Sequence, residues 1–343
     1  MRSILITGGA GFIGINSARY FASRGWGVTI LDNLSRRGGA DNLEWLRGRH
    51  AFEFEKADTR DAVAVAKVVA AIRPDVVLHL AGQVAVTTSV TNPREDLEIN
   101  ALGTFNMLEA VRQEGPDSFF LNASTNKVYG KMHDVSVVER NGRYEYQDLT
   151  QGANEAQPLD FHSPYGCSKG VADQYTLDYH RIYGMRTAAF RQSCIYGTRQ
   201  FGIEDQGWVA WFTIAAVLHK KITIFGDGKQ IRDILHVDDL VRAYEAVFTH
   251  ADKAAGMAFN IGGGPQNTLS LLELLAHLET KFGRKIELTW DKWRPGDQPV
   301  FVCDIALARE VLHWQPAIGV HQGVDSLADW VQQNESLFAW LKT

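Results

Sequence analysis

A glycine-rich turn directly after the first apolar run is the feature that most restricts how this chain can fold. Residues 4–6 are apolar, residues 7–14 read TGGAGFIG, and a helical pattern begins near residue 13. The glycines have the spacing GxxGxxG, at Gly8, Gly11 and Gly14. Glycine lets such a turn close and lets backbone amides approach a pyrophosphate at the positive end of the helix. This strand–turn–helix context predicts a dinucleotide-binding turn.

The first half of the chain alternates short β-rich runs with helical patterns. Short apolar strands separated by helices indicate a parallel sheet that is covered on both faces. The predicted strands are residues 4–6, 28–31, 76–80, 119–121 and 187–190. The predicted helices are residues 13–24, 62–71, 94–114 and 165–183.

The pattern changes near residue 194, where glycine and aromatic residues become frequent. Helical patterns return near 236–250, 268–282 and 321–334, with strand patterns near 222–225, 257–261 and 286–289. We predict the α/β class, with a Rossmann-type doubly wound parallel sheet and a smaller mixed α/β substrate-binding lobe. Residues 1–193 would form the dinucleotide-binding domain, to which 225–260 return, and 194–343 most of the second lobe. The polar segment 131–160 is interpreted as a long loop over a site.

Composition and charge narrow the classes of function. The chain of 343 residues is 45% hydrophobic and 22% charged with a net charge of −5, so we expect no nucleic-acid or membrane partner. Its three cysteines lie far apart without metal-ligand spacing, which predicts no metal, no disulfide framework and a reducing compartment. The first residues lack a signal-peptide pattern, and the apolar stretch 208–218 is too short to span a bilayer. These features predict a cytoplasmic protein.

An acidic residue ends the second predicted strand. Asp32 stands where a carboxylate can accept hydrogen bonds from both ribose hydroxyls of an adenosine, and it would repel a 2′-phosphate. It therefore favours NAD over NADP, although Arg36 and Arg37 follow closely and keep NADP open. Asp58 ends the next β-rich run and is a candidate for contact with the adenine, or alternatively a turn or helix cap.

A tyrosine and a lysine share one face of a predicted helix. Tyr165 and Lys169 have the spacing i, i+4, and Ser163-Pro164 before them marks a helix start. A neighbouring ammonium favours the phenolate, so we expect Lys169 to lower the pKa of Tyr165 toward neutrality. Tyr165 would then be a base for an alcohol that is oxidised by hydride transfer. The alternative is an ordinary surface pair, because YxxxK often occurs by chance.

Five motifs, taken in order, resemble those of the extended short-chain dehydrogenase/reductases that act on nucleotide sugars: TGGAGFIG, LAGQ, STNKVYG, YGCSK and FGDGKQIRDILHVDDL. The resemblance runs from residue 4 to about 304 and implies a tightly held NAD and transient oxidation of a sugar hydroxyl. It implies proton chemistry by Thr125, Tyr165 and Lys169. The NAD contacts that we expect, including an Asn100 that braces the site, are Gly8, Gly11, Phe12, Ile13, Gly14, Asp32, Asn33, Asp58, Thr59, Leu80, Ala81, Gln83, Asn100, Tyr165 and Lys169.

Departures from two branches of this family bear on the reaction. Related 4,6-dehydratases read Thr-Asp-Glu before VYG, where the acidic pair removes water, but this chain has Asn126 and Lys127. An amide and an ammonium cannot replace two carboxylates in β-elimination. UDP-glucose 4-epimerases have a lysine and an asparagine where this chain has Val84 and Cys194, which weakens the 4-epimerase interpretation. One interpretation of Lys127 is a pair with a carboxylate of the 131–160 segment.

A third branch, the CDP-paratose 2-epimerases (also called CDP-tyvelose epimerases), is most similar in AGQVAVTTSV, STNKVYG, LDFHSPYGCSKG and RQFGIEDQGWV. The resemblance implies inversion at C2 of a CDP-linked hexose, of the paratose type or glucose, through a 2-keto sugar. A 4-epimerase of a UDP- or CDP-hexose stays open. A non-catalytic dinucleotide sensor also stays open, although the intact Thr125, Tyr165 and Lys169 argue against it.

The substrate contacts that we expect come from polar, cationic and aromatic residues. Guanidinium groups match phosphates in a bidentate way, so the arginines are candidate diphosphate ligands, or alternatively surface ion pairs. The tryptophan could equally belong to the core, and the histidine could cap or pack near the helix start. The expected contacts are Thr88, Asn126, His162, Arg199, Gln206, Trp208, Arg232 and Arg294. The resemblance also suggests a homodimer or homotetramer built on the helices near 94–114 and 165–183.

Overall fold

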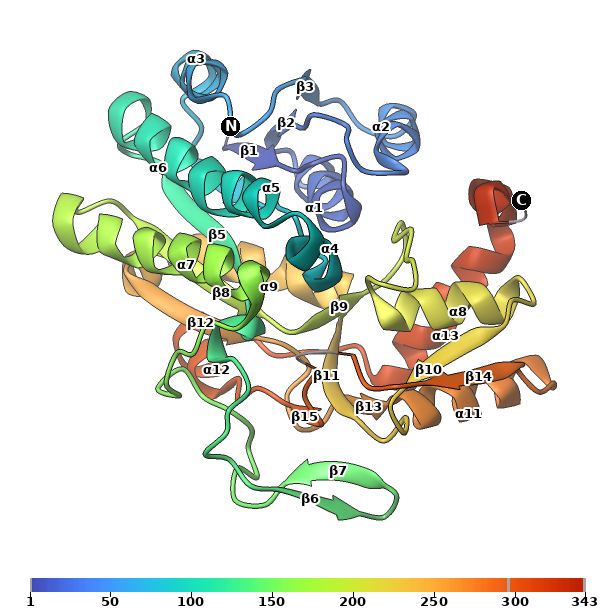
Figure 1. The fold of residues 1–343 in the computed structure, drawn as a ribbon. Helices are drawn as coiled ribbons and strands as arrows, with labels where there is room; N and C mark the ends of the chain where they lie inside the picture. Colours follow the sequence, from blue (N-terminus) through green and yellow to red (C-terminus); the bar gives the residue numbers. More distant parts are fainter. Residues whose placement is uncertain (1, 295–296, 342–343) are drawn as a thin grey trace.

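A parallel β-sheet forms the centre of the computed structural model, which describes residues 2–294 and 297–341 (Figure 1). Within those residues seven strands form the sheet, in the order β12-β8-β5-β4-β1-β2-β3. All six pairings between neighbours are parallel. The strands are β1 (Ser3–Thr7), β2 (Gly27–Leu31), β3 (Glu53–Glu55), β4 (Val76–His79), β5 (Phe119–Thr125), β8 (Thr187–Gln192) and β12 (Met257–Ile261).

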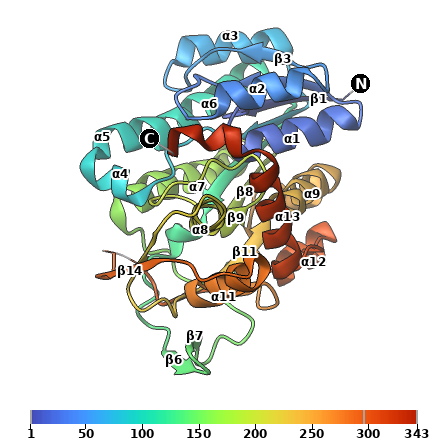
Figure 2. The same ribbon diagram turned by 90° about the vertical axis from the view of Figure 1, so that its right-hand side faces the viewer.

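Helices cover both faces of this sheet, which confirms the predicted doubly wound α/β class (Figure 2). Strands bury side chains on both faces, such as Ile4 and Leu5 in β1, which explains their continuous apolar sequences. One face packs on α1 (Phe12–Ser23), α2 (Gly39–Arg47), α9 (Val237–Thr249) and α12 (Ala306–Leu312). The other face packs on α3 (Ala62–Ile72), α6 (Gly103–Glu114) and α7 (Ser163–Tyr183).

Two parts of the first half differ from the prediction. The single helix predicted at 94–114 is divided into α5 (Pro93–Leu97), a π-helical turn η1 (Glu98–Leu102) and α6. A π turn inserts a residue into a helix and often marks a functional site. The pattern also missed α2. The edge strand β3 is the β-rich run that was expected before Asp58, although its sequence Glu-Phe-Glu is short and polar. The remaining short elements are α4 (Val86–Thr91), the 3₁₀ turn η2 (Asn126–Tyr129) and α10 (Ala251–Ala254).

The segment 131–160 is not the plain loop that we predicted. It contains an antiparallel hairpin of β6 (Val137–Arg140) and β7 (Arg143–Tyr146). Its turn is Asn141-Gly142, with both residues at positive φ, a dipeptide typical of tight hairpins and a signal that the prediction overlooked. The hairpin lies at the end of the molecule opposite to α2 and α3 (Figures 1 and 2). Tyr144 ties it to the second lobe through a 2.6 Å hydrogen bond to the Asp227 carboxylate.

The second lobe has its own apolar core. The helices and strands predicted there are present, while β12, α9 and α12 pack with the central sheet. Across the described part of the chain, no helix has the length and apolarity needed to cross a membrane. The elements of this lobe are β9 (Cys194–Tyr196), α8 (Trp208–Val217), β10 (Ile222–Phe225), β11 (Ile231–His236), β13 (Thr268–Ser270), α11 (Leu271–Phe282), β14 (Leu288–Asp291), β15 (Val300–Phe301), α13 (Val320–Gln333) and η3 (Glu335–Leu341).

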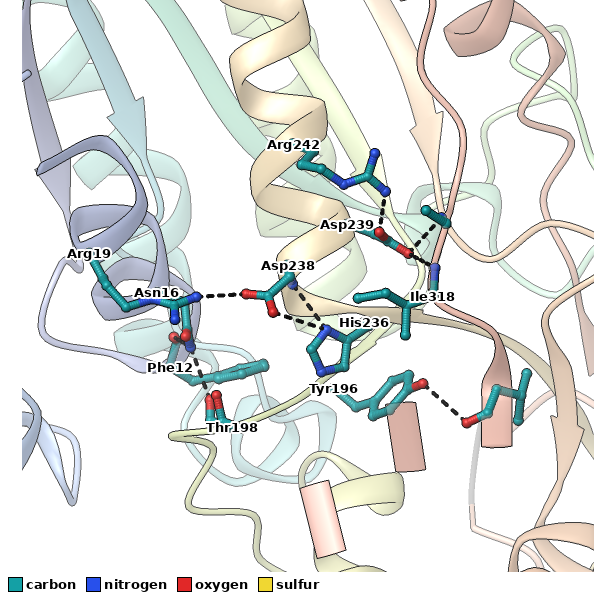
Figure 3. Close-up of polar contacts among 12 residues, drawn as sticks. Phe12, Asn16, Arg19, Tyr196, Thr198, His236, Asp238, Asp239, Arg242 and Ile318 are labelled. Carbon is teal, nitrogen blue, oxygen red and sulfur yellow. Dashed lines mark hydrogen bonds and ion pairs between the residues drawn. The ribbon is translucent and has the colours of Figure 1, made fainter. Parts of the chain in front are cut away.

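Polar contacts join the two halves beside the glycine-rich turn (Figure 3). The Asn16 amide in α1 donates a hydrogen bond to the Thr198 carbonyl at 2.9 Å. Arg19, in the same helix, pairs with Asp238 at 2.8 Å. Asp238 in turn donates its backbone N–H to the buried His236 ring at 3.3 Å. The loop that follows β9 is therefore held next to the first helix.

Candidate active site

The glycine-rich turn closes tightly against the end of β4. Gly8 has φ +65°, and a Cβ there would lie 2.8 Å from the Ala81 backbone nitrogen. A Cβ on Gly14 would collide with the Gly8 carbonyl, so neither position tolerates a side chain. The N-cap of α1 is Gly11, and its first turn contains Phe12 and Ile13. A glycine-lined helix start of this kind fits a pyrophosphate.

The carboxylate of Asp32 lies at the end of β2, beside the same turn. It accepts hydrogen bonds from the backbone amides of Ala10 at 3.1 Å and Leu34 at 2.7 Å. Burial raises the pKa of Asp32 above its usual range. These amides fix the carboxylate at the carboxyl edge of the sheet, where it fits the ribose of a dinucleotide.

Asp58 lies one strand further along, at the end of β3. It accepts a hydrogen bond from the Asn33 amide at 2.8 Å and pairs with Arg60 at 2.7 Å. The Arg60 guanidinium lowers the pKa of Asp58. Thr59 is buried, and its hydroxyl lies where a side chain on Gly103 would stand. The contacts of Asp58 are those of the alternative interpretation, in which this carboxylate stabilises a turn. Asn33, which donates to Asp58, directly follows Asp32 in the chain.

Asn100 braces the loop after β4 from the π turn. The Gln83 backbone amide donates to the Asn100 side-chain oxygen at 2.9 Å, and the Asn100 side-chain amide donates to the Gln83 carbonyl at 3.1 Å. The same amide donates to the Ser168 hydroxyl at 3.1 Å, and Ser168 donates to Asp96. Leu80 and Ala81 precede this loop. The buried network therefore joins the expected dinucleotide loop to helix α7.

Thr125, Tyr165 and Lys169 come together at the carboxyl end of β5. Thr125 ends that strand, and the other two lie in the first turns of α7. All three side chains are buried, and the Thr125 hydroxyl lies close enough to the Tyr165 phenol to act on its pKa. The Lys169 ammonium donates to the Ala123 carbonyl at 2.5 Å. A sugar hydroxyl placed at the two oxygens would meet both a donor and a proton acceptor.

The expected lowering of the Tyr165 pKa is wrong for this structure. Burial raises the pKa of Tyr165 to about 12, and the Thr125 hydroxyl and the charge of Arg36 oppose that shift. Burial also lowers the pKa of Lys169 to about 8, against the charges of Asp173 and Asp96. The sequence spacing places Tyr165 and Lys169 on one helix face. The loss of water around the phenol, however, raises the pKa of Tyr165 more than positive charge nearby lowers it.

Several expected substrate residues contact this group or belong to the second lobe. Asn126 accepts from the Thr125 hydroxyl at 3.3 Å. Gln206 accepts from Arg36 at 3.0 Å, which links the second lobe to the loop after β2. Trp208 is the first residue of α8, and its buried indole nitrogen has no hydrogen-bond partner among the described residues. The two other arginines pair with carboxylates at 2.5 and 3.2 Å: Arg232 with Asp297 and Arg294 with Asp205.

Three expected substrate residues have other surroundings. Arg199 is buried with its guanidinium 4.4 Å from the Trp45 ring centre and 5.9 Å from that of Trp330. Burial lowers its pKa to about 10. His162 is the N-cap residue of α7, and its ring contacts the Asp160 carboxylate at 2.7 Å. This contact is consistent with the alternative in which the histidine packs near the helix start. Thr88, the third of these expected substrate residues, lies exposed on α4.

Some polar residues of the site were not predicted from the sequence. Asp96 and Ser168 form the buried link to Asn100, and Gln298 accepts from the Lys127 ammonium at 3.3 Å. The proposed pair of Lys127 with a carboxylate of the 131–160 segment is therefore wrong. The contacts of Ser168 with Asn100 and of Gln298 with Lys127 join residues far apart in sequence, so no local pattern indicates them. No group of three or more His, Cys, Asp or Glu residues within the described ranges could hold a metal ion.

Comparison with known proteins agrees with this arrangement. The family model described as GDP-mannose 4,6 dehydratase matches residues 5–327. The chain is 46% identical to CDP-paratose 2-epimerase of Salmonella typhi, over 95% of this chain and 98% of that protein. It is 32% identical to UDP-glucose 4-epimerase of Mycolicibacterium smegmatis, over 93% and 95% of the two chains.

A solved structure shares both fold and extent. The UDP-glucose 4-epimerase of Thermus thermophilus, in complex with NAD, has a TM-score of 0.83 and 29% identity, covering 97% of this chain and 99% of its own. The doubly wound sheet agrees with the fold of this solved structure. The chain belongs to the GDP-mannose 4,6-dehydratase family of epimerases and dehydratases, the extended short-chain dehydrogenase/reductases of nucleotide sugars.

Proposed function

We propose that this protein is an NAD-dependent epimerase that inverts C2 of a CDP-linked hexose, of the paratose type or glucose. The observation that carries the proposal is the Thr125–Tyr165 hydroxyl pair followed by Asn126 and Lys127, which bring no carboxylate to the site. Such a site can exchange a proton and position an alcohol but lacks the acids for elimination. The 46% identity to a CDP-paratose 2-epimerase favours C2 over C4.

In the proposed reaction Tyr165 takes the proton of the C2 hydroxyl, and Thr125 donates a hydrogen bond to the same oxygen. NAD, which the glycine-rich turn and Asp32 would hold, would supply the acceptor and donor of the C2 hydride. The ketone turns so that its opposite face receives the hydride, and Tyr165 gives the proton back to the oxygen. Lys169, held by the Ala123 carbonyl, keeps a positive charge on the tyrosine's helix face. Proton and hydride both return to the substrate, so the reaction needs no further redox partner.

The raised pKa of Tyr165 gives this proposal a pH dependence. A buried phenol with a pKa of about 12 is protonated at neutral pH, so the fraction of phenolate grows as pH rises. We therefore expect the epimerisation rate to increase from neutral to alkaline pH, until the loss of the Lys169 charge opposes it.

Incubation with a panel of CDP- and UDP-hexoses, followed by NMR at C2 and C4, tests the reaction. We expect inversion at C2 of a CDP-hexose. In deuterated water the inverted carbon should carry no solvent deuterium, because the hydride stays within the site, whereas an enolate would incorporate it. Inversion at C4 alone would establish the 4-epimerase alternative instead, and no turnover with any sugar would favour a sensor.

We further propose that a homo-oligomer forms through helices α6 and α7. Phe105, Val171 and Tyr175 on these helices are 40%, 38% and 45% exposed, and the rings of Phe105 and Tyr175 meet edge to face at 5.9 Å. Exposed aromatic and branched side chains on adjoining helices are typical of a contact between subunits. A second copy of this chain is the occupant that we propose.

A charge on this face should dissociate the oligomer. We expect Phe105→Glu to reduce the mass measured by light scattering after gel filtration, because a carboxylate would be buried without a partner. Val63→Glu is the control, since Val63 is 65% exposed on α3. An unchanged mass for Phe105→Glu would place the contact elsewhere.

A further inference from the structure

The lysine that follows the reactive threonine has no role in the proton chemistry above. Lys127 belongs to the 3₁₀ turn at the end of β5, and its backbone amide donates to the Thr125 hydroxyl at 3.2 Å. Its ammonium reaches the second lobe, where it donates to the Gln298 side-chain oxygen at 3.3 Å. The Gln298 amide in turn donates to the Gly130 carbonyl. One residue thus connects the threonine to the other wall of the site.

The charges around this lysine are not balanced. Arg232 pairs with Asp297 at 2.5 Å, and the Gln298 backbone amide donates to the same carboxylate oxygen at 3.0 Å. Lys127 lies close enough to Arg232 and Asp297 for both charges to act on it. Among residues 2–294 and 297–341, Lys127 forms no ion pair of its own, so two cations share one carboxylate. Burial lowers the pKa of Lys127, which indicates that its charge lacks full compensation.

The chemistry of a nucleotide sugar offers the missing anion. The diphosphate is bonded to C1 of the sugar, and C2 is the neighbouring carbon, whereas C4 lies across the ring. A substrate that presents C2 to Thr125 and Tyr165 must therefore bring its sugar-linked phosphate close to the turn that follows Thr125. Lysine is a compact point charge that suits a phosphate oxygen from this position.

Resting on the proposed function, we propose that Lys127 is a positioning residue that binds the sugar-linked phosphate, opposite Arg232, and so holds C2 at the reactive hydroxyls. A substrate oxygen would replace the weak Gln298 contact of the ammonium. The pair of cations would then face the dianionic diphosphate, with Asp297 retained by the arginine.

The affinities of CDP and CMP isolate this contact, because the two probes differ by the phosphate in question. Isothermal titration of the NAD-loaded protein should show that Lys127→Met weakens CDP binding by about 10- to 100-fold, the value of a charge-assisted hydrogen bond. CMP binding should stay unchanged. Lys131→Met, which removes an exposed lysine nearby, is the matched control and should leave both affinities unaltered.

The comparison separates positioning from a structural role. The proposal would be overturned if Lys127→Met weakened CDP binding and CMP binding equally. It would also be overturned if the variant kept the wild-type ratio of the CDP and CMP affinities. If Lys127→Met does not fold, Lys127→Gln retains a hydrogen bond to Gln298 and serves for the same titration. A wild-type protein that inverts only C4 would contradict the proposed function, whereas the CDP and CMP affinities judge the phosphate contact separately.

Discussion

Replacement of Tyr165 by phenylalanine is expected to reduce kcat for epimerisation by about 10²- to 10⁴-fold, the contribution of a positioned acid–base group. The phenol is buried beside the Thr125 hydroxyl, so a water molecule cannot easily take its place. NMR detection of the inverted sugar under single-turnover conditions measures this loss. The NAD content of the purified variant should match that of the wild type, because the ring keeps its packing.

A second tyrosine on the same helix provides the matched control. Tyr183 is 54% exposed at the far end of α7, so Tyr183→Phe should turn over at the wild-type rate. A Tyr165→Phe variant that kept more than about a tenth of the wild-type rate would remove Tyr165 from the proton transfer. That result would leave Thr125 as the candidate base.

Asp173→Asn is expected to lower the free energy of unfolding by about 3–5 kcal/mol, since it leaves a buried arginine without its partner. The side chains of Asp173 and Arg191 are 0% and 5% exposed, and the guanidinium makes contacts of 3.0 and 3.1 Å with the carboxylate. Ser124 also donates to this carboxylate at 2.6 Å. The loss should therefore reach the end of β5, next to Thr125. Urea unfolding, followed by circular dichroism, measures it.

An exposed ion pair on the same helix is the control for this change. Asp178 pairs with Arg181 at 3.3 Å, and its side chain is 51% exposed. Asp178→Asn should change the free energy of unfolding by less than about 1 kcal/mol, because water screens the pair. Equal stability of the two variants would mean that burial of the Asp173 pair contributes nothing beyond a surface contact.

Features with short-range causes could be predicted from the sequence. The glycine spacing, the strand that precedes it and the i, i+4 relation of Tyr165 and Lys169 all depend on backbone geometry within a few residues. The apolar strands of the parallel sheet were predicted for the same reason, since burial on both faces leaves a continuous run. The π turn at 98–102 leaves no such local pattern and was missed, while the polar edge strand β3 was expected only as a β-rich run before Asp58.

The sequence by itself determined the doubly wound fold, the dinucleotide turn and the residue types of the reactive group. Only the tertiary structure decided the state and partners of those residues. It raises the pKa of Tyr165, because burial removes the water that would stabilise the phenolate. That burial cannot be read from the residues next to Tyr165 in the sequence. The tertiary structure also brings Lys127 to Gln298 and stacks Arg199 between Trp45 and Trp330. Such contacts depend on how the two lobes pack, and that packing is settled by the whole chain.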